Sequence, residues 1–122
     1  SLTLYTNHVS QPCRAVMALL ALGKIEHSEK EIELFTGGAR TPEFLEINPF
    51  GGIPFIVHAD LKLSESNAIL TYLCDAFPEK LGAFNGANLQ EKAKINQIMS
   101  YYQGTFRPAL MGTLRAKIMA VR

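Results

Sequence analysis

The sequence predicts an α/β domain with the element order βαβαββα, followed by a long amphipathic helix. Short runs of apolar residues alternate with longer segments in which apolar residues recur every three or four positions. Serine, threonine or glutamate stands at the start of these longer segments, and glycine or proline follows their ends, as is typical of helix boundaries. With 122 residues, 48% of them hydrophobic, the chain is long enough for one domain and part of a second.

The first half of this order is a strand, a helix and a second strand. Residues 2–5 form the first strand, and Ser10-Gln11-Pro12 begins a helix because proline is tolerated in a first helical turn. The helix runs to about Leu22, where Gly23 ends it. Its apolar face is formed by four residues, Cys13, Val16, Met17 and Leu20. Residues 28–34 alternate weakly and predict a second strand, which the intervening helix makes parallel to the first.

The second half begins with a short helix at Thr41-Pro42-Glu43, which ends before Asn48-Pro49. Residues 55–57 and 61–63 are short strands separated by the turn at residues 58–60. A helix over about residues 65–77 then ends before Pro78. Its predicted inward face consists of Ala68, Ile69, Tyr72, Leu73 and Ala76. This order of elements is that of a thioredoxin-like domain, which we place at residues 1–77.

The rest of the chain predicts a linker at residues 78–88 and a long helix at residues 89–122, the first part of an all-helical domain. Pro108 should kink this helix. Its apolar residues recur at helical spacing, at Ile95, Ile98, Met99, Tyr102, Phe106, Leu110, Leu114 and Ile118. This apolar stripe is longer than one small domain can cover, so we expect a homodimer or another association through the helix.

Composition argues against several classes of function. Lys and Arg exceed Asp and Glu by one, and no basic stripe is interleaved with aromatic residues, so nucleic acid is not an expected partner. No apolar run approaches the roughly 18 residues of a membrane span, so no membrane partner is expected. The two cysteines, Cys13 and Cys74, are too few for a disulfide scaffold, and a cytoplasmic location is the default. No His, Cys and carboxylate cluster has the spacing of metal ligands.

Two segments suggest a site for a peptide-like ligand. The first is Asn48-Pro49-Phe50-Gly51-Gly52-Ile53-Pro54, where the Ile53-Pro54 bond is expected to be cis and to leave backbone hydrogen-bonding groups facing a ligand. The second is the helix start at Glu65 and Ser66, where free backbone N–H groups favour a carboxylate. A glutamyl-like end group would suit that helix start.

The motifs Ser10-Gln11-Pro12-Cys13-Arg14, N-P-x-G-x-I-P and E-S-x-A-I together resemble the glutathione transferase family, and its theta class in particular. The resemblance covers about residues 2–77 and implies that glutathione is a co-substrate, that no other cofactor is needed, and that the second substrate is a small hydrophobic electrophile. It implies that Ser10 faces the cysteine sulfur of glutathione and is the catalytic residue. It also implies that Ile53 and Pro54 contact the cysteinyl amide, and that Glu65 and Ser66 hold the γ-glutamyl end.

The chain departs from the theta-like pattern at positions expected near the glycyl carboxylate of glutathione. Ala39 stands where such sequences carry histidine, and Gly52 where they carry lysine. Arg40 is adjacent and is the candidate replacement donor. Family members also continue through an all-helical second domain, of which this chain has the first helix, with Arg107 matching an arginine near the active site of theta-like enzymes.

Two alternatives to a transferase stay open at this point. The departures at positions 39 and 52 are compatible with a glutathione-binding or protein-interaction module with little turnover. A thiol-disulfide oxidoreductase is less well supported because Ser10 stands at the first position of what would be a C-x-x-C motif with Cys13, and serine forms no mixed disulfide.

Overall fold

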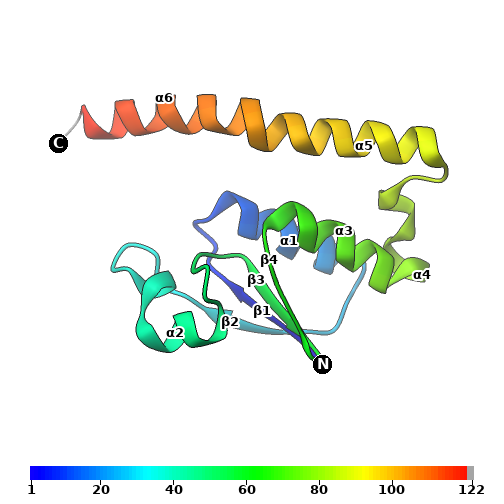
Figure 1. The fold of residues 1–122 in the computed structure, drawn as a ribbon, viewed down its shortest axis with the longest axis horizontal. Coiled ribbons are helices and arrows are strands. Elements are labelled where there is room, and N and C mark those ends of the chain that lie inside the picture. The colour runs from blue at the N-terminus through cyan, green and yellow to red at the C-terminus, as the bar shows by residue number, and fades with distance from the viewer. Residues whose placement is uncertain (121–122) are drawn as a thin grey trace. The chain divides into compact units, whose positions relative to one another are not determined.

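The computed structural model describes residues 1–120, which fall into two compact units, one of residues 1–84 and one that begins at Asn85. The first unit is built on a four-stranded mixed sheet of strand order β2-β1-β3-β4 (Figure 1). Its strands are β1 (Leu2–Thr6), β2 (Ser28–Glu31), β3 (Phe55–His58) and β4 (Leu61–Ser64). β1 pairs with β2 in parallel and with β3 antiparallel, and β3 pairs antiparallel with β4. This confirms the predicted thioredoxin-like domain.

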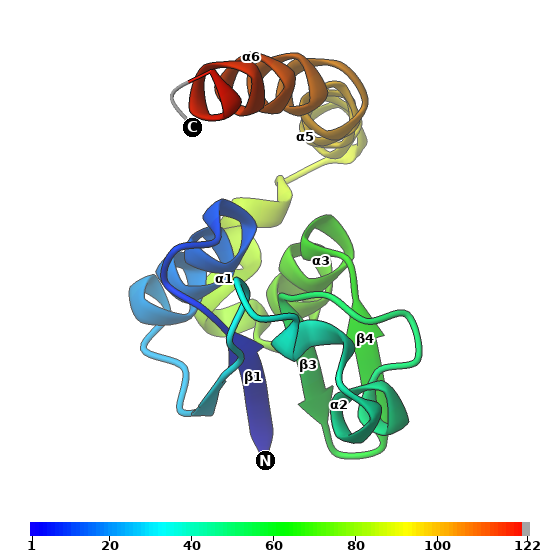
Figure 2. The same cartoon turned by 90° about the vertical axis from the view of Figure 1, so that its left-hand side faces the viewer.

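Alternation along the strands sends side chains to two separate cores. The helices α1 (Gln11–Leu22) and α3 (Ser66–Ala76) cover one face of the sheet, side by side in Figure 2. Leu4 and Ile56 point to that face and are fully buried with Leu20, Ile69 and Leu73. On the other face, Tyr5 and Phe55 pack with Phe44 of the helix α2 (Pro42–Ile47), with ring centroids 5.6–6.1 Å apart.

Helix starts follow the predicted capping. Ser10 caps α1 and Thr41 caps α2, each accepting a hydrogen bond from the backbone N–H three residues ahead. A 3-10 helix, η1 (Gly38–Arg40), precedes α2 and was not predicted. β2 ends at Glu31 rather than at residue 34, although the Ile32 N–H still donates to the carbonyl of Thr6 at 2.9 Å.

The predicted inward face of α3 is partly wrong. Ile69 and Leu73 are fully buried, but Ala68 is exposed. Ser66 and Cys74 are buried in its place, because the helix turns a slightly different stripe toward the sheet. Tyr72 and Ala76 are half-buried.

The structure differs from the predicted linker at residues 78–88. The helix α4 (Pro78–Leu81) and the 3-10 helix η2 (Gly82–Asn85) occupy most of this segment. Leu81 is fully buried in the core shared by α1 and α3. A methyl group at Gly23 would lie 2.5 Å from Cδ2 of Leu81, so the glycine that ends α1 leaves room for this leucine. The first unit therefore runs to Phe84.

The second unit is one long helical run, made of α5 (Leu89–Tyr101), the π-helical turn η3 (Tyr102–Phe106) and α6 (Arg107–Met119). Pro108 has no N–H to donate to the carbonyl of Gly104, and the π-helical turn η3 stands just before it, next to the position where the kink was predicted. Several apolar side chains of this unit are exposed, which are Leu89, Ile98, Phe106, Leu110, Leu114 and Ile118. No helix in the described part of the chain is long and apolar enough to span a bilayer.

Candidate functional site

Strand register brings three predicted site segments to one end of the sheet, where β1 and β4 finish and β3 begins. Tyr5 of β1 lies opposite Phe55 of β3, and Phe55 lies opposite Ser64 of β4. Three segments therefore lie at the same end of the sheet. They are the loop between β1 and Ser10, the residues just before β3, and the residues just after β4. Ser10, the Ile53-Pro54 bond and Glu65 thus follow or precede strands at the same end of the sheet although they are far apart in the sequence.

Ser10 lies at the amino end of α1 and is partly exposed. Its Oγ accepts a hydrogen bond from the Cys13 N–H at 3.4 Å, a long distance for a cap. The hydroxyl proton is not used by this bond and has no acceptor among the described residues. No acidic residue occupies the first turn of α1, so the positive end of the helix dipole is not neutralised there. The site can therefore stabilise an anion with one O–H donor and a helix terminus.

The loop before Ser10 is held by two side chains that sequence reasoning missed. Asn7, only 5% exposed, donates from Nδ2 to the carbonyl of Ile32 at 3.0 Å and accepts from the Val9 N–H at 2.9 Å. Arg14 donates from Nη1 to the carbonyls of His8 and Val9 at 2.9 and 2.8 Å. An asparagine three residues before a predicted catalytic serine could have suggested a side chain that holds the loop. The burial that gives Asn7 this role is visible only in the structure.

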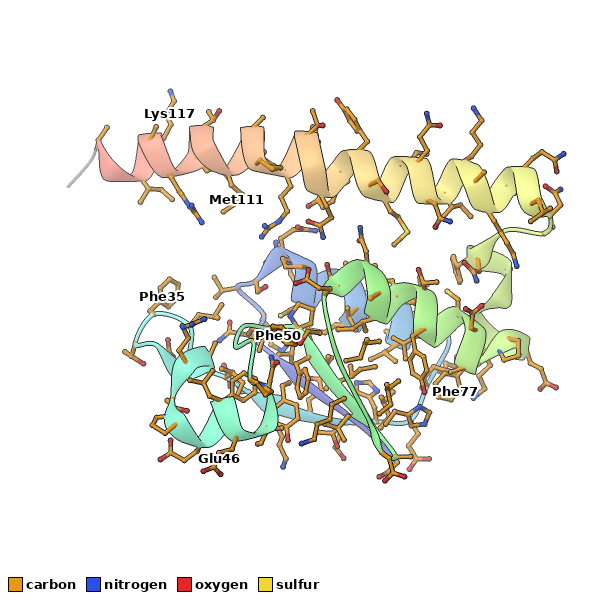
Figure 3. All side chains as sticks on the ribbon, viewed as in Figure 1. Phe35, Glu46, Phe50, Phe77, Met111 and Lys117 are labelled. Atoms are coloured by element: carbon orange, nitrogen blue, oxygen red, sulfur yellow. The ribbon has the colours of Figure 1, made fainter. Side chains whose placement is uncertain are left out.

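The Ile53-Pro54 peptide bond is cis, as predicted. Ile53 lies just before β3, and neither its N–H nor its C=O has a hydrogen-bond partner among the described residues. It is only partly buried, so both groups are available to an extended ligand. Phe50, labelled in Figure 3, lies on the same bend and is 83% exposed.

Asn48 holds this bend in shape, a role that its place in the motif did not reveal. It is 1% exposed, and its Nδ2 donates to the carbonyls of Gly51 and Gly52 at 3.0 and 3.1 Å. Its Oδ1 accepts from the Ser64 hydroxyl at 3.0 Å. One amide thus connects the bend before Pro54 to the end of β4.

Glu65 and Ser66 stand at the start of α3. Glu65 is exposed and adopts φ 72° and ψ 114°, a conformation that non-glycine residues rarely take, and its side chain does not cap the helix. Such outliers persist where surrounding structure over-determines them, and they cluster at ligand sites. Ser66 is 7% exposed. The backbone angles of Glu65 fix the direction of its Cα–Cβ bond, and the carboxylate is exposed.

The remaining predicted contacts lie on η1 and in the second unit. Arg40 is exposed at the end of η1, and its Nη1 lies 3.0 Å from where a Gly51 methyl group would be. Ala39 packs against the cluster of Tyr5, Phe44 and Phe55, and its carbonyl accepts from the Gly52 N–H at 3.3 Å. Arg107 begins α6 in the second unit, and its part in substrate binding stays a prediction.

The two cysteines are buried and unpaired. Burial raises the pKa of the Cys74 thiol, and the neighbouring Asp75 carboxylate raises it further. In the described residues, no group of three or more His, Cys, Asp or Glu side chains is placed to hold a metal ion.

Comparison with known proteins places this geometry in a family. A family model described as "Glutathione S-transferase, N-terminal domain" matches residues 1–75. Two Arabidopsis thaliana proteins, glutathione S-transferase T3 and glutathione S-transferase T1, are each 37% identical to the chain over 111 residues, or 91% of its length. The chain spans 19% of the first relative and 45% of the second, so it corresponds to less than half of either protein.

Solved structures agree with the sequence comparison. Human glutathione-S-transferase T1-1 in its apo form superposes with a TM-score of 0.82 at 29% identity, covering 88% of this chain and 44% of the human one. The matched family model, the relatives and the shared fold lead to one conclusion. The chain belongs to the glutathione S-transferase family, of which its first 75 residues are the N-terminal domain.

Proposed function

We propose that the site binds glutathione as a co-substrate and presents its thiolate to a small hydrophobic electrophile. The observation that carries this proposal is the unpaired backbone of Ile53 at the same end of the sheet as the unused hydroxyl proton of Ser10. The first can pair with the cysteinyl residue of an extended peptide, and the second can donate to that residue's sulfur. The nucleophile then arrives with the ligand, so the protein needs no nucleophile of its own and no other cofactor.

Ionising the thiol is the energetic task of this site. A free thiol has a pKa of about 8.5, so the thiolate must be favoured by about 2 kcal/mol to predominate at neutral pH. A hydrogen bond to a charged group contributes about 1.5–3 kcal/mol, and a helix amino terminus adds about 0.3–1 kcal/mol. The Ser10 hydroxyl and the uncompensated end of α1 are together sufficient.

The γ-glutamyl end of glutathione carries one ammonium and one carboxylate group. The exposed Glu65 carboxylate, held by its unusual backbone angles, is suited to the ammonium group. The first turn of α3, which contains no acidic residue and begins at Ser66, is suited to the carboxylate. Pro54, buried beside Ile53, shapes the surface on which the cysteinyl residue would lie.

The motif around Ser10 favours a theta-like enzyme, and a detoxifying conjugation of hydrophobic electrophiles is the activity that we propose. Arg107, at the start of α6, is the proposed contact from the second unit. Glutathione is abundant in reducing compartments, and both cysteines are unpaired, so we place the protein in the cytoplasm. The exposed apolar residues of α5 and α6 support a homodimer, which light scattering would detect as twice the chain mass.

A glutathione-binding or protein-interaction module is the second candidate. It is favoured by Ala39 and Gly52, which provide no charged side chain where theta-like sequences carry histidine and lysine. A conjugation assay with a generic aryl halide separates the two, because only the enzyme consumes the halide faster than free glutathione does.

Substitution of Ser10 by alanine tests the mechanism. Ser10→Ala should keep glutathione binding nearly intact and lower turnover by up to about a hundredfold, as loss of a preorganised donor does in other enzymes. Thr41→Ala is the control, because Thr41 Oγ1 also caps a helix, accepting from the Phe44 N–H at 3.2 Å, while its hydroxyl proton is already donated to the carbonyl of Gly38. Both variants should lose about 1 kcal/mol of stability from the lost cap, but only the first should lose turnover. Equal turnover in the two variants would reduce Ser10 to a helix cap.

A further inference from the structure

Asn7 makes three hydrogen bonds at the point where the chain leaves β1. It is only 5% exposed, and an amide buried to this degree is costly unless both of its ends are bonded. Nδ2 donates to the carbonyl of Ile32 at 3.0 Å, and Oδ1 accepts from the Val9 N–H at 2.9 Å. The backbone carbonyl of Asn7 accepts from the Ser10 N–H at 3.1 Å. One residue therefore holds the turn that ends at Ser10.

Ile32 gives this turn a fixed point of attachment. Its N–H donates to the carbonyl of Thr6 at 2.9 Å, which continues the pairing of β1 with β2 by one residue. Its side chain packs against the aromatic cluster that contains Tyr5. The carbonyl that accepts from Asn7 is thus held both by the sheet and by a core, and the Asn7 amide connects the turn to that fixed backbone.

Asparagine fits both partners of this side chain, whereas a shorter side chain does not. The Ile32 carbonyl requires a donor and the Val9 N–H requires an acceptor, so the two partners fix which end of the amide faces which. A serine at position 7 could still accept from the Val9 N–H, as serine does in many turns, but it is too short to donate to Ile32 as well. A substitution can therefore remove the bond to Ile32 selectively.

We propose that Asn7 is a positioning residue, which sets where the Ser10 hydroxyl stands relative to the sulfur of bound glutathione. This inference rests on the proposed function, because that sulfur is the group to which the hydroxyl would donate. Ser10 ends the turn that the buried amide holds, so its hydroxyl depends on the amide for its position. Without the amide, the turn keeps the bonds that Arg14 donates to the carbonyls of His8 and Val9. The hydroxyl is then less well placed but still present.

Asn7→Ala should impair ionisation of the thiol and turnover without impairing binding of the peptide. A displacement of about 1 Å at a reacting group can cost up to about a hundredfold in rate, so a hydroxyl that is misplaced part of the time should cost about tenfold in kcat. The pKa of the bound glutathione thiol should rise by about one, which is an about tenfold change in its ionisation. S-methylglutathione, which has no ionisable thiol, should bind within about twofold of the parent, because no hydrogen bond of Asn7 reaches Ile53 or Glu65.

Three measurements on each variant test this proposal. The ultraviolet absorbance of the thiolate across pH gives the pKa of bound glutathione, rates with an aryl halide give kcat and KM, and calorimetry gives the affinity for S-methylglutathione. Asn7→Ser removes the bond to Ile32 and keeps the one from Val9, so it should resemble Asn7→Ala. Leu81→Val is the control, because Leu81 packs beside Gly23 at the far end of α1 from Ser10. It should lower the urea midpoint of unfolding but leave the thiol pKa and kcat unchanged.

Each other outcome contradicts a definite part of the reasoning. An unchanged thiol pKa in Asn7→Ala, or an equal loss of kcat in Leu81→Val, would overturn the positioning role. Loss of affinity for S-methylglutathione in Asn7→Ala would make Asn7 a residue that supports peptide binding and not the hydroxyl. Parent-like behaviour of Asn7→Ser alone would overturn the part assigned to Ile32. If the parent protein neither bound S-methylglutathione nor lowered the thiol pKa, the proposed function would fall together with this inference.

Discussion

Replacing Asn48 by alanine should both destabilise the first unit and weaken ligand binding. The substitution removes three hydrogen bonds, two donated to the carbonyls of Gly51 and Gly52 and one accepted from Ser64. Each such bond contributes about 1 kcal/mol net, so Asn48→Ala should lower the free energy of unfolding by about 3 kcal/mol. Most surface substitutions change it by less than about 0.5 kcal/mol.

The effect on binding follows from the freedom of the bend. Without the amide, two glycines with positive φ must be ordered by the ligand itself, and ordering one residue costs about 1–2 kcal/mol. Glutathione should therefore bind about tenfold more weakly or worse, as measured by titration calorimetry.

Urea unfolding of Asn48→Ala, Ser64→Ala and the double variant separates the contributions. Ser64→Ala alone should lose about 1 kcal/mol, and the double variant should lose about 1 kcal/mol less than the two single losses added, because both remove the same bond. Asn96→Ala, which replaces an exposed asparagine on α5, serves as the control. If Asn48→Ala lost less than about 1 kcal/mol and bound glutathione normally, the bend would be held by the backbone bonds that Gly51 and Gly52 donate, and our reasoning on Asn48 would be wrong.

Three further predictions concern other parts of the site and the core. Glu65→Gly should be more stable to urea than Glu65→Ala by about 1 kcal/mol, because glycine tolerates a positive φ; the reverse order would show that φ 72° carries no strain. Ala39→His should tighten glutathione binding, measured by calorimetry, more than Gly52→Lys does, because a lysine in the left-handed conformation at position 52 costs about 1–2 kcal/mol. Equal tightening by the two substitutions would contradict this strain at position 52. The Cys74 thiol has a raised pKa in the folded chain, so the folded state keeps its proton when the unfolded thiol ionises at about pH 8.5. The free energy of unfolding in urea should therefore fall as the pH rises past that value, and Cys74→Ala should make this fall less steep. If the fall were equally steep in Cys74→Ala, Cys74 would not be its cause.

The elements with strong local signals were predictable, and those that depend on distant partners were not. The helix that begins at Ser10 and the one that ends before Pro78 have apolar periodicity and clear stops, and the first also has a side-chain cap. Both appear within a residue or two of their predicted bounds. The segment at residues 78–85 has one leucine and no periodicity, so its glycines and asparagine suggested a linker. Leu81 folds inward against the distant Gly23 and the core of α1 and α3, partners that the local sequence does not reveal.

The same distinction applies to the candidate site. The Ile53-Pro54 bond was predictable because motif and residue type agree, and the structure confirms its cis form. The contacts of Asn48 and Asn7 were not, because each joins segments whose proximity is a result of strand register. A sequence displays the residues that a ligand touches more readily than the buried amides that hold those residues in place.

Because Leu81 is buried in the core, the first folding unit ends later in the sequence than the family motif does. The family match stops at residue 75, yet this fully buried side chain comes six residues later and fills the core between α1 and α3. A polypeptide stopped at residue 77 would retain every residue of the ligand-binding motifs and lose a core leucine, a deletion of the kind that costs about 2–5 kcal/mol. Because a small domain has only about 5–15 kcal/mol to lose, exchanging N-terminal domains between relatives should succeed at residue 84 and yield poorly folded chimaeras at residue 77.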